Sequence, residues 1–420
     1  MEPHPDRGNA PDRIPALDGL RGCAVLLVIF VHTNLGFAGV RSLDGVYNAI
    51  ASAGWVGVDL FFVLSGFLIT GILYDARRAD RYFRNFYARR TLRIWPLYYG
   101  FLIFALWMLP TLLPGWGLGS GWAKLSLLTF WYNFWAPAHS PLPLYHIFWS
   151  LCVEEHYYLL WPLVIRFTGR RAAMKWCLVL MGVSLLFRVG VLASGTWIQY
   201  AYLITPCRLD GLAAGSLVAL SIRDPADSAR LSRWARPALI AAGALLVGLG
   251  LTHGHLAPHI DLKREPIAAV DSKLIVTLGM TGVSMFFAAL LVVLLGSPQG
   301  PPGRALRRVM EAPALRSVGK YSYGMYVFHA LVLEVIRWGV LRASPAEAYP
   351  WPVKLALTAC VAGVAYGVAF VSYHLYEKRF LRLKRFFRHE PPQAACDGGG
   401  PGPQQGDDPG KLRVLVASGA

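Results

Sequence analysis

Charged residues are scarce in this chain of 420 residues: Asp, Glu, Lys and Arg together make up 15%, whereas soluble globular proteins contain about 25%. Hydrophobic residues make up 55%, and 14 Trp, 19 Tyr and 21 Phe are spread among them. This composition argues against an ordinary soluble domain. It is typical of a protein that crosses a membrane several times and places Trp and Tyr at the interfaces.

Cysteine is also rare, and none of the six Cys stands in a CxxC or Cys/His spacing. We therefore expect neither a disulfide framework nor a metal site. The polar, Pro-rich stretch MEPHPDRGNAPDRIPALD lacks a charged segment followed at once by an apolar core, so we expect no cleaved signal peptide. The chain shows no internal repeat and no separate soluble domain.

Long apolar runs are the main feature of the chain. A membrane-spanning helix needs roughly 20 mostly apolar residues, and runs of this kind predict an all-α, polytopic membrane protein with about ten transmembrane helices. The shorter apolar stretch 123–135 predicts an interfacial or re-entrant segment. The ten predicted spans are 20–38, 54–74, 93–113, 146–166, 173–193, 200–220, 237–253, 274–295, 321–341 and 353–375.

The basic residues indicate the orientation of these helices. Lys and Arg outnumber Asp and Glu by 41 to 24, for a net charge of +17. They gather in the loops after every second predicted helix, which favours topology signalling over nucleic-acid binding and places both termini in the cytoplasm. We predict a cytoplasmic tail over 1–16, a transmembrane domain over 17–380, and a basic, then disordered cytoplasmic tail over 381–420.

Two ionisable side chains, Arg21 and His32, interrupt the first apolar run, LDGLRGCAVLLVIFVHT. Eleven residues at about 100° each place them on one helix face, about 16 Å apart along the axis. Arg21 would lie at the cytoplasmic mouth, where a guanidinium suits phosphate, and His32 near mid-membrane, where a neutral imidazole can accept a hydroxyl proton. The alternative is a snorkelling arginine and a histidine bonded to a nearby carbonyl.

The acidic pair in HIFWSLCVEEHYYLLWP, Glu154 and Glu155, is predicted near mid-membrane. Adjacent helical residues point in different directions, so at most one of the two faces a common pocket with His32. We assign that place to Glu154. The alternative is a structural ion pair between Glu154 and Arg208.

Other polar residues also lie within or next to the predicted helices, where an ionisable side chain is a functional-site hypothesis by default. Each alone could be a structural pair, a topology signal or an interface anchor. Together they need one another or a wet cavity, which indicates an internal reaction or transport chamber. The residues that we assign to substrate or donor binding are Arg89, Arg93, Asp59, Ser65, His146, Arg208, Asp210 and His329.

The three arginines in RRTLRIWPLYY, at 89, 90 and 93, admit two interpretations. They either set the topology or form a cytoplasmic cradle for the phosphates of a nucleotide-bearing donor.

These segments, in their order, resemble the membrane acyltransferase-3 family of transmembrane O-acyltransferases, which modify bacterial surface glycans and some secondary metabolites. The resemblance spans about residues 14–380. It rests on LDGLRG followed by His32, and on GVDLFFVLSGFLI, RRTLRIWPLYY, HIFWSLCVEEHYYLLWP, RLDGLAAGS and SYGMYVFH. The chain departs from the family at His156, where Gln is frequent, and it shows no GDSL-type hydrolase segment.

The resemblance implies transfer of an acyl group, expected to be acetyl, from acyl-CoA to a hydroxyl of a carbohydrate or glycosylated acceptor at the bacterial inner membrane. His32, Arg21 and Glu154 would be catalytic, with His32 as general base and Arg21 either holding the donor phosphate or orienting the cavity at its cytoplasmic mouth. Glu154 and Arg208 would line or brace the pocket, and His329 would assist.

The expected partners are acyl-CoA, the carbohydrate acceptor and the lipid bilayer, with no bound cofactor and no nucleic acid. The alternative function is a secondary transporter that exports a glycan or small metabolite and uses the intramembrane ionisable residues as a proton relay. A sensor or scaffold without turnover is a third option. No feature of the sequence indicates an oligomeric state.

Overall fold

The computed structural model describes residues 14–33, 43–113, 115–139, 143–253, 273–296, 301–339 and 349–387. Over these ranges the chain forms helices and turns and contains no strand, which confirms the all-α class. Most of the predicted tails, 1–16 and 381–420, lies outside the described residues.

The helices follow one another with short connections, and 3-10 or π turns extend several of them. The longer α-helices are α1 (Pro15–Thr33), α3 (Val56–Asp75), α4 (Tyr82–Ile103), α9 (Trp149–Phe167), α10 (Arg170–Ala193), α12 (Leu209–Ser221), α13 (Pro225–His253), α15 (Met280–Leu295), α17 (Pro313–Gly339) and α18 (Trp351–Ser372). The shorter ones are α2 (Leu43–Ser52), α5 (Leu109–Leu112), α6 (Gly121–Leu128), α7 (Tyr132–Trp135), α8 (Pro143–His146), α11 (Ile198–Leu203), α16 (Pro301–Met310) and α19 (Lys378–Arg382).

Six helical segments in the described part of the chain are long and apolar enough to cross a membrane: Pro15–Thr33, Leu43–Asp75, Tyr82–Leu112, Arg170–Ala193, Ile275–Leu295 and Trp351–Phe386. They correspond to six of the ten predicted spans, and the chain is a multi-pass membrane protein. The other four predicted spans fall on α9, α11 with α12, α13 and α17. The count of ten and the cytoplasmic placement of the termini stay predictions.

The predicted continuous helix over 200–220 is wrong, because the chain forms two helices there. α11 ends at Leu203, a 3-10 turn occupies Thr205–Cys207, and α12 begins at Leu209. Pro206 explains the interruption, since proline has no amide hydrogen for a helical hydrogen bond and disfavours a helical conformation in the residue before it. The break matters for the polar interior, because it places Arg208 at the start of α12.

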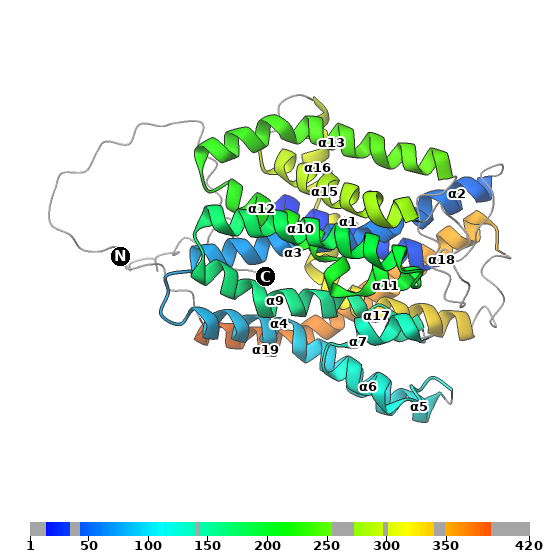
Figure 1. The fold of residues 1–420 in the computed structure, drawn as a ribbon. Helices are drawn as coiled ribbons and strands as arrows, with labels where there is room; N and C mark the ends of the chain where they lie inside the picture. The colour runs from blue at the N-terminus through cyan, green and yellow to red at the C-terminus, as the bar shows by residue number, and fades with distance from the viewer. Residues whose placement is uncertain are drawn as a thin grey trace, which may run out of the picture.

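The axes of most long helices are roughly aligned, and the arginine-bearing connections from α3 to α4, from α9 to α10 and from α12 to α13 lie at one end of the bundle, on the left in Figure 1. There Arg166 donates a hydrogen bond to the carbonyl oxygen of Arg77 over 2.8 Å, and Arg223 pairs with Asp75 over 2.8 Å. Arg170 pairs in the same region with Asp227 over 2.7 Å. By the positive-inside rule we infer that this is the cytoplasmic end.

Two of the apolar helices lie at the periphery of the bundle. Within the most apolar stretch of α10 only 22% of residues are buried, and within that of Trp351–Phe386 only 17%. Large apolar side chains such as Leu186 and Val371 are exposed on them. A continuous apolar face of this kind indicates contact with lipid chains.

Helices α3 and α12 pack with their backbones in contact. A Cβ atom added to Gly66 of α3 would lie 1.9 Å from the carbonyl oxygen of Leu212, and one added to Gly215 of α12 would lie 1.9 Å from that of Val63. Small residues permit such an approach between membrane helices. Ser216 strengthens the contact by donating a hydrogen bond to the Gly66 carbonyl oxygen over 3.2 Å.

The packing of α3 on α12 predicts the effect of a single added methyl group. We expect Gly66→Ala to lower the free energy of unfolding by about 1–3 kcal/mol, because neither backbone can retreat without separating the two helices. Gly182→Ala in α10 is the matched control, since nothing lies within 4 Å of its added Cβ. Thermal unfolding of both variants in detergent measures the difference, and an equal midpoint for the two would contradict the packing.

Candidate active site

A pocket opens between α1, α3, α4, α9 and α17. We call it the central pocket. Along α3 its lining extends from Leu68 to Val58, which at 1.5 Å per residue is about 15 Å. The pocket therefore leads from the cytoplasmic side toward the middle of the bundle.

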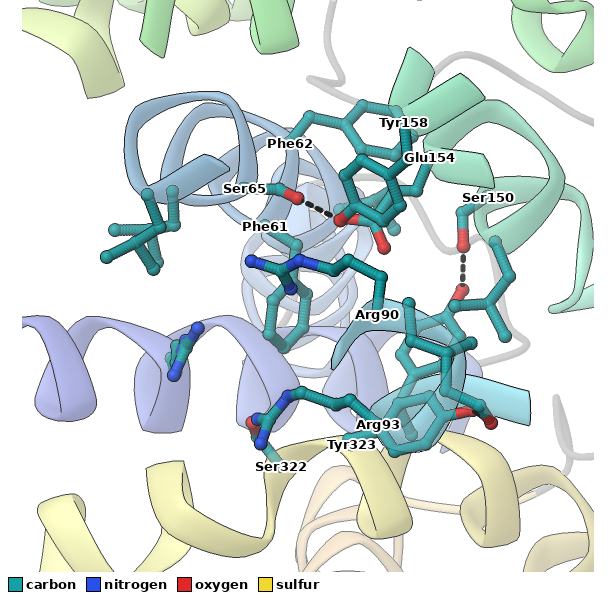
Figure 2. A pocket seen from close by; sticks show the side chains of 17 residues that line it. Phe61, Phe62, Ser65, Arg90, Arg93, Ser150, Glu154, Tyr158, Ser322 and Tyr323 are labelled. Atoms are coloured by element: carbon teal, nitrogen blue, oxygen red, sulfur yellow. Dashed lines mark hydrogen bonds between the residues drawn. The ribbon is translucent and has the colours of Figure 1, made fainter. Parts of the chain in front are cut away.

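Three arginines line the part of this pocket nearest the arginine-rich end of the bundle: Arg21 from α1, and Arg90 and Arg93 from α4. Figure 2 shows the Arg90 and Arg93 side chains extending across the pocket in the same direction. None of the three pairs with a carboxylate among the described residues. Carboxylates lie nearby without forming an ion pair: Asp18 interacts electrostatically with Arg21, Glu154 with Arg90, and Glu377 with Arg93. Three guanidinium groups lining one pocket make this mouth suitable for a ligand with negative charges.

The middle of the pocket holds hydroxyl groups beside that carboxylate. Ser65 of α3 and Tyr158 of α9 form a short hydrogen bond, and Glu154 lies next to the pair (Figure 2). The guanidinium carbon of Arg90 lies 5.4 Å from the centroid of the Tyr158 ring. Glu154 and Tyr158 are four residues apart, so both project from the same face of α9.

Aromatic rings form the inner end of the pocket and connect it to two histidines. Tyr326 of α17 lines the pocket, and its ring centroid lies 5.7 Å from that of His329. His329 in turn lies 5.0 Å from His32 of α1, in an edge-on arrangement. His146 of α8 is close enough to His32 for the two to interact electrostatically. Three predicted site histidines thus gather just beyond the inner end.

The hydrogen bonds of these histidines fix which ring nitrogen is free. Nδ1 of His32 lies 2.7 Å from the carbonyl oxygen of Val28, and Nδ1 of His329 lies 2.7 Å from that of Tyr326. A carbonyl oxygen only accepts, so Nδ1 carries the hydrogen in both neutral rings and Nε2 carries a lone pair. Nε2 of His329 is buried without a hydrogen-bond partner. Each ring therefore offers a free base.

Three other predicted site residues lie outside the pocket lining, in two buried ion pairs. Arg208 pairs with Asp59 over 3.0 Å, and Arg188 pairs with Asp210 over 2.9 Å, with all four side chains at most 1% exposed. The guanidinium of Arg208 is also packed among the rings of Phe62, Trp149 and Tyr202, at 5.0 to 5.4 Å. Arg208 therefore pairs with Asp59, not with Glu154, and it supports the pocket wall through Phe62.

The structure separates the arginines of RRTLRIWPLYY. Arg90 and Arg93 line the pocket, whereas Arg89 donates a hydrogen bond to the carbonyl oxygen of Phe387 over 3.4 Å, outside the lining. Of the predicted site residues, the pocket brings together Arg21, Arg93, Ser65 and Glu154.

Sequence reasoning missed four residues that build or support this region. Arg188 had a signal, since it is an arginine inside the apolar run 173–193. Tyr158 had another, because it follows Glu154 by one helical turn. Tyr326 and Ser150 had no such signal, because an uncharged residue in an apolar helix usually only packs against its neighbours.

A membrane-embedded pocket with a cationic mouth and free imidazoles past its inner end is suited to group transfer from a polyanionic donor. The chain belongs to the acyltransferase family: the family described as "Acyltransferase domain" matches residues 14–374. This confirms the resemblance drawn from the motifs.

Relatives of known name match most of the chain. The peptidoglycan O-acetyltransferase OatA of Listeria monocytogenes is 24% identical over 402 residues, which are 89% of this chain and 58% of OatA. The protein YrhL of Bacillus subtilis is 29% identical over 390 residues, 87% of this chain and 54% of YrhL. The O-acetyltransferase OatA of Staphylococcus aureus is 24% identical over 417 residues, 88% of this chain and 58% of that protein.

The chain thus spans somewhat more than half the length of these relatives. No solved structure matches the chain.

The buried ion pairs predict a large effect on stability. We expect Asp59→Ala to lower the free energy of unfolding by about 3–5 kcal/mol, because Arg208 is left buried without a countercharge. Glu311→Ala is the control, since it breaks an exposed pair with Arg307 on α16 and should cost less than about 0.5 kcal/mol. Thermal unfolding in detergent measures both, and equal losses would contradict a supporting role for Asp59.

Proposed function

We propose that this protein is an O-acetyltransferase of the bacterial inner membrane that moves an acetyl group from acetyl-CoA to a hydroxyl of a cell-envelope carbohydrate. The observation that carries the proposal is the different chemistry of the two ends of one pocket. Three arginines without an ion pair line its mouth, and histidines with a free Nε2 lie just past its inner end. The peptidoglycan substrate named for the Listeria relative supports a carbohydrate acceptor.

The mouth suits the donor. Acyl-CoA is made in the cytoplasm and carries several phosphate charges, which guanidinium groups bind through charge-assisted hydrogen bonds. Arg21, Arg90 and Arg93 supply three such groups in one place. The pantetheine arm would follow the pocket of about 15 Å inward and bring its thioester to the aromatic end. Of the two interpretations of RRTLRIWPLYY, the proposal therefore adopts the phosphate cradle for Arg90 and Arg93.

The chemistry follows from the free imidazole nitrogen. The acceptor oxygen attacks the thioester carbonyl carbon while Nε2 of His32 takes the hydroxyl proton. The new C–O bond forms, the C–S bond breaks, and the proton passes from His32 to the departing sulfur. The products are an ester and free CoA. In the proposal His329 holds the ring of His32 in place through their edge-on contact, and Glu154 orients Tyr158 and the cationic mouth.

A transporter with a proton relay is the rival function. A relay needs ionisable groups that can exchange protons in sequence. Asp59, Arg208, Arg188 and Asp210 are instead paired with one another, two by two. That arrangement favours a structural role for these four residues and leaves the pocket for catalysis.

The general base is tested by His32→Ala. We expect kcat to fall by about 10²–10⁴-fold with little change in the donor KM, because the imidazole acts only in the transition state. The assay measures CoA release from acetyl-CoA by the purified full chain, with a peptidoglycan fragment as acceptor. His139→Ala is the control, since His139 is exposed and stacked on Trp135. Undiminished kcat in His32→Ala would remove His32 from the reaction.

The donor cradle is tested by Arg90→Ala. We expect the KM for acetyl-CoA to rise by about 10–100-fold with a smaller change in kcat, because a hydrogen bond to a charged group contributes about 1.5–3 kcal/mol. Arg84→Ala is the control, since Arg84 is exposed and packs on Phe387. An unchanged donor KM in Arg90→Ala would contradict phosphate binding at this mouth.

A further inference from the structure

Two aromatic rings meet at the inner end of the central pocket. Phe61 of α3 and Tyr326 of α17 both line it, with ring centroids 6.1 Å apart and planes at 79°. Val58 lines the same end one helical turn beyond Phe61, and it is 6% exposed. These two rings, packed edge to face, thus narrow the inner end of the pocket.

Tyr326 is held in place by its hydroxyl group. Its Oη donates a hydrogen bond to the carbonyl oxygen of Ile147 over 2.8 Å and lies 2.6 Å from Oγ of Ser150. A phenol has one hydrogen, which Tyr326 donates to Ile147, so the Ser150 hydroxyl donates to the Tyr326 Oη. This oxygen therefore both donates and accepts a hydrogen bond. The ring can move away from the pocket only by giving up both bonds.

Two histidines that do not line the pocket lie next to this end. The ring of His329 lies 5.7 Å from that of Tyr326 and is fully buried, and the ring of His32 lies 5.0 Å from that of His329. Because Phe61 and Tyr326 line the pocket and the histidines do not, the acyl end of a donor that enters from the mouth meets these two rings first. Of the acyl chains compared here, the methyl group of acetyl needs the least room beside Phe61 and Tyr326. Each added methylene has to displace one of these rings.

We infer that Phe61 and Tyr326 are the residues that determine the acyl length of the donor and restrict it to acetyl. The inference rests on the proposed function and adds the part of the pocket that selects the substrate. The transferred group changes in length only, so the bonds made and broken are those given above. Phe61 is the movable member of the pair, because Tyr326 is fixed by Ser150 and Ile147.

The test compares acetyl-, butyryl- and hexanoyl-CoA as donors for the purified full chain, by kcat/KM of CoA release. We expect the wild type to prefer acetyl over butyryl by about 100-fold, the discrimination a packed pocket achieves for one or two methylenes. Phe61→Ala should reduce this preference to less than about 10-fold, with Phe61→Leu between the two. Phe167→Ala is the matched control, since Phe167 is 74% exposed at the end of α9 and should leave the preference unchanged.

The outcomes separate this inference from the proposed function. Acetyl transfer by Phe61→Ala with the wild-type preference for acetyl would overturn the inference alone, as would a wild type that uses butyryl-CoA equally well. No CoA release by the wild type from any of the three donors would overturn the proposed function and the inference with it. If Phe61→Ala does not fold, as judged by size-exclusion chromatography, the preference of Phe61→Leu decides in the same way.

Discussion

The orientation of α1 is the constraint on which the rest of the site depends. The backbones of α1 and α17 touch at glycines on both helices. A Cβ added to Gly22 of α1 would lie 2.4 Å from the carbonyl oxygen of Leu315, and one added to Gly319 of α17 would lie 1.8 Å from that of Asp18. Because these contacts leave no room for rotation, α1 presents one face to the pocket. That face carries Arg21 at one end and, three turns later, His32 beside His329.

The buried polar side chains divide into two groups with different physical roles. Asp59, Arg208, Asp210 and Arg188 neutralise one another, which is the arrangement that makes a buried charge tolerable. The arginines of the pocket mouth form no ion pair within the described chain and line an open cavity. A charge without an ion pair near a membrane interior is costly, so its presence favours a function that uses it. The first group holds the wall in place, and in the proposed function the second binds the donor.

The length of the apolar runs was enough to predict the all-α class, and helical spacing was enough to predict a common face for Arg21 and His32, because each depends only on residues close together in the sequence. The pairing of Asp59 with Arg208 was not predictable, since it joins residues 149 positions apart and depends on how α3 meets α12. Sequence patterns therefore identified charged residues that need partners without saying which partner each one finds. Tyr326 shows the other limit: its place at the inner end of the pocket depends on Ser150 and Ile147, on another helix and its preceding turn.

In the proposed function, one rigid helix joins the donor mouth to the proton acceptor. An experimental structure of the full chain with a non-hydrolysable acetyl-CoA analogue tests that claim most directly. The account predicts the phosphates at Arg21, Arg90 and Arg93, and the acetyl end at Phe61 and Tyr326, on the pocket side of His32. Density for the analogue at the opposite end of the bundle, or phosphates away from all three arginines, would contradict it.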